Sequence, residues 1–182
     1  MHRNIIIHTA TFDLEAVLPI PCSLVSQAYY KRKLSSYNFT VYSLSDGKGT
    51  CFFWNETDGQ QGSCGIAACL HLYLNSLSSC TEQFSDSCIG QNRNTFVASA
   101  LLHAVCTSTY LKVVNHKFLE PGHKQMECDS MHSAMEYAKR KTNIYVFELI
   151  KSLHWASSDI CPCQNVLSSH NTFWHKQNVF QY

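Results

Sequence analysis

The chain has 182 residues, enough for one domain of ordinary size, and 45% of them are apolar, which is the share that a packed core requires. Its 14 basic and 13 acidic residues nearly cancel, so total charge argues neither for nor against a polyanionic partner, and any nucleic-acid surface has to be local. No apolar run reaches the roughly 18 residues of a membrane span and no signal-peptide pattern opens the sequence, so we expect an intracellular protein without a membrane partner.

The first third of the chain predicts three strands. Residues 5–12 are apolar and β-branched and lead directly into Asp13, which indicates a buried strand with a carboxylate at its end. Pro19 and Pro21 interrupt the segment that follows. Residues 38–44 alternate apolar and polar side chains, and residues 50–54 follow a glycine-containing turn, so these two segments predict an antiparallel hairpin.

Two helices are predicted in the middle of the chain, separated by a short segment that contains Asp86. Ser63 is a candidate cap for the first helix, whose apolar positions recur at helical spacing: Ile66, Leu70, Tyr73 and Leu77. Residues 82–88, around Asp86, hold too few apolar side chains for periodicity alone to identify a strand. Residues 94–106 predict a second and mostly buried helix.

A strand and a third helix complete the predicted order. Residues 111–119 form the strand, and Pro121 and Gly122 end it. Residues 129–141 form the helix, with an apolar side and a second side that carries Asp129, His132 and Glu136. The predicted order is therefore β-β-β-α-β-α-β-α, an α/β domain over residues 1–145, followed by an extension at 146–182 that we leave unassigned.

Several short motifs resemble one known family. They are TFDL at 11–14, YYKRKL at 29–34, YN at 37–38, SDSC at 85–88, GQNRN at 90–94 and HKFLEPGH at 116–123. Together they resemble, over residues 12–145, a family of uncharacterised, transposon-derived animal proteins whose core is similar to ribonuclease-H-like transposases and integrases of the DDE/DDD type. The resemblance implies a ribonuclease-H-like mixed five-stranded sheet flanked by helices, a nuclear location and DNA as the partner; a homo-oligomer is left open.

Three aspartates are the leading candidates for metal ligands. Two-metal phosphoryl transfer needs carboxylates from different elements, because Mg²⁺ or Mn²⁺ prefers oxygen ligands on either side of the scissile phosphate. In a ribonuclease-H-like sheet, Asp13, Asp86 and Asp129 would converge. The resemblance implies that Asp13 and Asp86 bridge the metal and that Asp129, or Glu136 two turns later, completes the site. The alternative is that these carboxylates are ordinary surface groups or helix caps.

Other polar groups are candidates for nucleic-acid contacts. Lys31, Arg32 and Lys33 follow two tyrosines, a combination that stacks bases and neutralises phosphates, or else forms a solvated loop. Gln91, Asn92 and Asn94 precede a helix, where amides cap the helix or hold a phosphate. His123 and His132 flank Asp129 and are candidate proton donors or ligands, or hydrogen-bonded surface groups.

The cysteines and remaining histidines do not suggest a separate site. Ten cysteines are spread through apolar segments, which favours buried thiols over disulfides. Cys161 and Cys163, with His170 and His175, do not have the common Cys-x-x-Cys zinc spacing. We therefore expect a Mg²⁺- or Mn²⁺-dependent nuclease or strand-transfer core acting on DNA. The alternative is a domesticated or decayed domain of the same fold that binds DNA or protein without catalysis.

Overall fold

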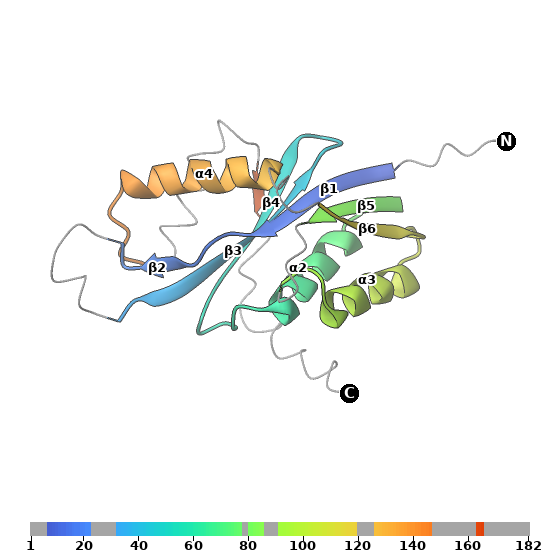
Figure 1. The fold of residues 1–182 in the computed structure, drawn as a ribbon, viewed down its shortest axis with the longest axis horizontal. Helices are drawn as coiled ribbons and strands as arrows, with labels where there is room; N and C mark the ends of the chain where they lie inside the picture. The colour runs from blue at the N-terminus through green and yellow to red at the C-terminus, as the bar shows by residue number, and fades with distance from the viewer. Residues whose placement is uncertain are drawn as a thin grey trace.

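The computed structural model describes residues 7–22, 32–77, 80–85, 91–119, 126–146 and 163–165. These residues form a mixed α/β structure (Figure 1). The strands are β1 (Ile7–Leu14), β2 (Leu18–Ile20), β3 (Leu34–Ser43), β4 (Lys48–Asn55), β5 (Cys80–Ser85), β6 (Val114–Phe118) and β7 (Cys163–Asn165). The helices are α2 (Ser63–Asn75), α3 (Thr95–Thr107) and α4 (Glu127–Arg140).

All of these strands belong to one sheet, in the order β6-β5-β1-β3-β4-β7, with β2 paired to β3 beside this path. β1 lies in the middle, antiparallel to β3 and parallel to β5, and β5 is in turn parallel to β6. The expected order of the major elements is present, but the prediction of five strands is wrong, because β2 and β7 make the sheet seven-stranded. Each additional strand has only three residues, too few for a recognisable alternation.

The hairpin between β3 and β4 forms where the turn residues predicted it. The two strands pair from Ser36↔Asn55 to Ser43↔Lys48, and the amide of Gly47 donates to the carbonyl of Ser43 at 3.0 Å. Gly47 has φ of +66°, a conformation that costs a residue with a side chain more than it costs glycine. Both strands are longer than predicted, because β3 begins at Leu34 and β4 runs from Lys48 to Asn55.

The main core lies on the face of the sheet that α2 and α3 cover. Alternate residues of β1, Ala10, Phe12 and Leu14, point to this face and are buried. The predicted apolar side of α2 is confirmed, because Ile66, Leu70 and Tyr73 are buried in the same cluster and Leu77 packs against it. The prediction that α3 is mostly buried is only half right: Phe96 and Leu102 are exposed, and Val97, Ala100, Leu101 and Ala104 supply its buried side.

Helix α4 lies on the opposite face of the sheet, against β1 and β3 (Figure 1). Its residues Cys128, Met131 and Met135 are buried. Met135 joins a second, small apolar cluster with three buried residues from outside the helix, Leu18, Ile20 and Ile144. This face differs from the other because the strand residues beneath the helix are largely polar. Thr11, Ser36, Asn38 and Thr40 are all buried there.

The helix starts show where local chemistry predicted the cap and where it did not. Asn94 caps α3, since its Oδ1 accepts a hydrogen bond from the amide of Val97 at 3.1 Å. Ser63 does not cap α2: it is the first helical residue, and Gly62 occupies the cap position without a side-chain hydrogen bond.

The described cysteines bear out the prediction of buried thiols in part. Cys22, Cys51, Cys64, Cys69, Cys106 and Cys128 are thiols, of which Cys51, Cys69 and Cys128 are buried, whereas Cys64 and Cys106 are exposed. The cysteines and histidines between 161 and 175 that were considered for zinc have no described side chains. Among the helices that the structure describes, none has the length and hydropathy to cross a bilayer.

Candidate metal centre

Asp13, Asp129 and His132 form the one group of possible metal ligands among the described residues. Each offers a ligand atom, and these three atoms lie within 4.8 Å of one another. Asp13 comes from the central strand β1, and the other two come from α4, where a spacing of three residues places them on the same side of the helix. All three side chains are half-buried. The cluster therefore joins the sheet to the helix that covers it.

Packing at the start of α4 explains why Asp129 and His132 reach β1. Cys128 is buried and contacts both strands. Its thiol donates to the carbonyl of Thr11 on β1 at 3.5 Å and lies 3.6 Å from the carbonyl of Thr40 on β3. Thr11 also donates to the carboxylate of Glu127 at 3.4 Å. These contacts fix the first turn of the helix over β1 and β3, and Asp129 and His132 then project beside Asp13.

Each candidate ligand on the helix has a second contact that holds its orientation. The Oδ2 atom of Asp129 accepts a hydrogen bond from the amide of Met126 at 2.8 Å, which also satisfies a backbone donor at the helix start. The Nε2 atom of His132 lies 3.0 Å from the hydroxyl of Thr40, the residue that pairs with Asp13 between β1 and β3. Partners of this kind keep ligating side chains in position in metal sites.

The electrostatics of His132 suit a ligand. Burial lowers the pKa of its imidazole to about 4, and the negative charge of Asp129 opposes this shift in part. The ring is therefore neutral near pH 7, and the neutral ring is the form that binds metal ions. Asp13 and Asp129 supply negative charge within the same small volume, a charge that a divalent cation would neutralise.

Glu15 is a buried carboxyl beside this cluster that sequence reasoning missed. It follows Asp13 by two residues along the chain, its side chain is 4% exposed, and its Oε2 accepts from the amide of Asn38 at 2.8 Å. Burial raises the pKa of Glu15 to about 7, opposed by the Asn38 hydrogen bond, with further effects from Glu136 and Lys139. Alternate residues of a strand share a face, so the sequence could have placed Glu15 on the same face as Asp13. Nothing in the sequence indicated that α4 would cover that face.

The other predicted metal ligands are placed differently. Glu136 is outside the group of three, and its carboxylate accepts a hydrogen bond from Lys139, one turn further along α4. Asp86 lies outside the described residues. Its neighbour Ser85 is the last residue of β5, the strand that runs parallel to β1 with Thr11 opposite Phe84. Of the two candidates for the third ligand, Asp129 is therefore better placed than Glu136, because only Asp129 belongs to the group of three.

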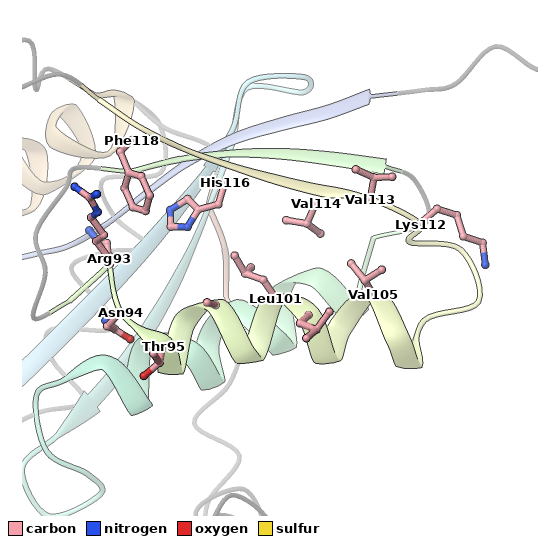
Figure 2. A pocket seen from close by; sticks show the side chains of 13 residues that line it. Arg93, Asn94, Thr95, Leu101, Val105, Lys112, Val113, Val114, His116 and Phe118 are labelled. Carbon is pink, nitrogen blue, oxygen red and sulfur yellow. The ribbon is translucent and has the colours of Figure 1, made fainter.

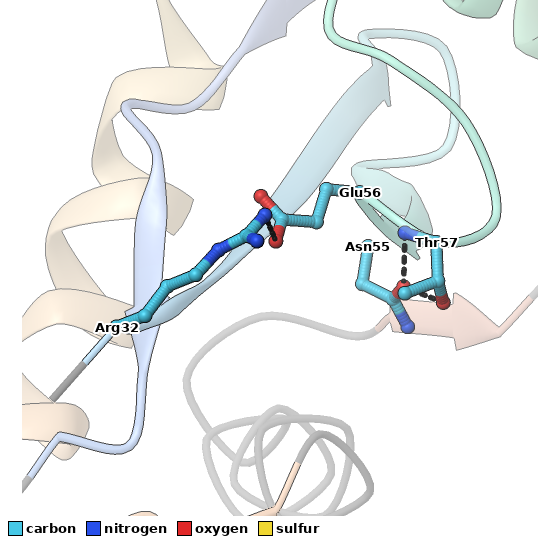
Figure 3. A network of polar contacts seen from close by, with 4 residues as sticks. All are labelled: Arg32, Asn55, Glu56 and Thr57. Carbon is cyan, nitrogen blue, oxygen red and sulfur yellow. Dashed lines mark hydrogen bonds and ion pairs between the residues drawn. The ribbon is translucent and has the colours of Figure 1, made fainter.

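The predicted nucleic-acid ligands that the structure describes belong to two segments, 32–33 before β3 and 91–94 before α3. Arg32 forms an ion pair with Glu56 at 3.1 Å, next to the hydrogen-bonded Asn55 and Thr57 (Figure 3). The amide of Asn94 donates to the carbonyl of Gln91 at 3.0 Å in addition to its capping bond, and Asn92 is 1% exposed. These contacts agree with capping as the role of Asn94. Lys33 is half-buried, whereas Lys31 and His123 lie outside the described residues.

Comparison with known proteins adds no relative. No family model, no curated protein and no solved structure matches this chain.

Proposed function

We propose that this chain is a ribonuclease-H-like catalytic core that uses a divalent metal ion to cleave or transfer phosphodiester bonds of DNA. The observation that carries the proposal is the meeting of Asp13 on the central strand with Asp129 and His132 on α4. Asp13 is more than 110 positions from the other two residues in the chain, and Asp13 and Asp129 are two of the three aspartates that the family resemblance selects. A nuclear location follows from the same proposal.

The arrangement of the elements supports the proposal. The described residues contain the element order β-β-β-α-β-α-β-α, and β1 lies between the antiparallel strand β3 and the parallel strand β5. Asp13 is near the end of β1, and parallel β5 ends at Ser85, directly before Asp86. The proposal therefore includes Asp86 as a further ligand beside Asp13.

The donor set fits a divalent cation that accepts both oxygen and nitrogen. Carboxylate oxygens suit Mg²⁺ and Mn²⁺, and a neutral imidazole suits the transition metals, so Mn²⁺ matches the mixed set better than Mg²⁺ does. When bound, such an ion supplies charge for the phosphate oxygens and an activated water or 3′ hydroxyl for in-line attack. Asp13, Asp129 and His132 would hold it, and Thr40 would keep the His132 ring in orientation.

Calorimetric titration of Mn²⁺, together with cleavage of end-labelled DNA, tests the proposal. We expect one or two Mn²⁺ ions to bind the wild type, and binding and cleavage to be lost together in Asp13→Asn and in Asp86→Asn. Asp46→Asn, at an exposed turn position, is the matched control and should retain both. Absence of Mn²⁺ binding in the wild type would refute the proposal, and binding without cleavage would favour a catalytically inactive DNA- or protein-binding domain.

A further inference from the structure

A groove of about 750 Å³ lies between helix α3 and strand β6, away from the metal centre. Its walls are mainly apolar, and they come from both elements and from the segment that joins them (Figure 2). The apolar lining residues are Ala98, Leu101, Leu102, Val105, Val113, Val114 and Phe118. A groove of this size accommodates several side chains of a bound segment.

Large apolar side chains beside the groove remain unusually exposed. Leu102 is 65% exposed, Val113 is 49% exposed and Phe118 is 39% exposed, and all three line the groove. Scattered exposed apolar residues are ordinary, but a contiguous group around a groove indicates a surface that binds a partner. The apolar groove therefore suits a binding partner that has apolar side chains.

The charged residues that line the groove are both basic. Arg93 stands at one end with its guanidinium 5.7 Å from the centre of the Phe118 ring, and Lys112 stands at the other end (Figure 2). No aspartate or glutamate is among the described residues that line it. This pattern complements an apolar segment with acidic residues at both ends. It does not suit a nucleic acid, whose evenly spaced phosphates would lie along an apolar centre.

Strand β6 is the outermost described strand on the side of the sheet where the groove lies. It is the last strand on its side of the sheet within the described chain, pairing with β5 along one edge, and it runs for five residues beside the groove. An outer strand presents backbone donors and acceptors that an extended peptide can pair with. A peptide added there would lie over α3 and direct alternate side chains into the groove.

We propose that the groove between α3 and β6 binds an extended apolar segment of a partner protein, flanked by acidic residues, which pairs with β6 as an additional strand. Apolar side chains in the groove and backbone pairing give the affinity, and Arg93 and Lys112 select for the acidic flanks. The proposal is independent of the metal centre, because it uses the other face and one edge of the sheet.

Two synthetic peptides with the same alternating valine and threonine centre test the proposal, one with Glu-Asp flanks and one with Lys-Lys flanks. Their binding to ¹⁵N-labelled protein is followed by NMR titration and amide exchange. We expect the acidic peptide to bind at least about tenfold more tightly than the basic one. We also expect it to shift residues of α3 and β6 and to slow exchange of β6 amides.

Charge reversal provides the control. Arg93→Glu combined with Lys112→Glu should reverse the preference between the two peptides, whereas Lys48→Glu, on strand β4, should leave it unchanged. The proposal is wrong if neither peptide binds, if both bind equally, or if the shifts fall outside α3 and β6. It is equally wrong if dilution of the protein alone produces the β6 shifts, which would identify a second copy of this chain as the occupant, or if a short oligonucleotide produces them.

Discussion

Replacing Asp13 with asparagine should stabilise the metal-free protein and at the same time remove its response to metal. Oxygens of Asp13 and Asp129 lie within 4.8 Å of each other, so two negative charges at that distance repel by about 1 kcal/mol in a water-like dielectric and about 3 kcal/mol at an effective dielectric of 20. The asparagine side chain would keep the shape of the aspartate and remove one charge. In the proposed metal site, the repulsion between the two carboxylates would lower the folding stability of the metal-free protein.

Thermal unfolding at pH 7.5, in EDTA and in Mn²⁺, measures both effects. In EDTA we expect Asp13→Asn to unfold at a temperature higher by about 3 °C for each kcal/mol of relieved repulsion. In Mn²⁺ at about a hundred times its dissociation constant, the wild type should gain about 2.7 kcal/mol and the variant almost nothing. Asp46→Asn should match the wild type in both buffers. A variant that is less stable in EDTA, or that responds to Mn²⁺ as the wild type does, would refute the reasoning.

Three further substitutions test separate parts of the structure. His132→Gln should weaken Mn²⁺ binding at least about tenfold and Mg²⁺ binding less, measured by titration calorimetry, since imidazole is the donor that Mn²⁺ accepts more readily. His116 has its pKa lowered to about 4 by burial, so its neutral form contributes stability above pH 6.5 that is lost as the pH falls toward 4. Between pH 7 and pH 5, the free energy of unfolding of His116→Gln, measured with denaturant, should therefore fall by about 1 kcal/mol less than that of the wild type. This value is reduced for solvent screening, because the ring is only half-buried. Asn94→Ala should cost about 1 kcal/mol in the same assay because it removes the cap of α3, and equal stability would contradict the capping role.

The sequence predicted those parts of the fold that depend only on residues close together in the chain. The strand that ends near Asp13, the apolar side of α2 and the cap of α3 each follow from spacing within a few residues. Asp13 and Asp129 were identified by family resemblance, and the structure brings them together. The ribonuclease-H-like fold and the DNA-directed activity stay predictions.

The polar face beneath α4 could not be predicted. Asn38 and Thr40 alternate with the core residues Phe39 and Val41, so a strand pattern assigns them to solvent. The structure buries them because α4 covers that face, and this depends on contacts between residues about 90 positions apart. Glu15 was missed for the same reason, since its burial depends on a helix more than a hundred residues later in the chain.

The contacts under α4 also bear on how the domain opens. Thiol, hydroxyl and thioether groups make several of the contacts that hold the helix to the sheet, whereas aromatic and aliphatic side chains fill the opposite face. A layer attached in this way has less apolar area to lose when it separates, so α4 is the element that we expect to detach before the rest unfolds. The candidate ligands come from both the sheet and α4, so an ion bound between them would hold the helix to the sheet. The ion concentration would then set the fraction of molecules in which α4 is detached.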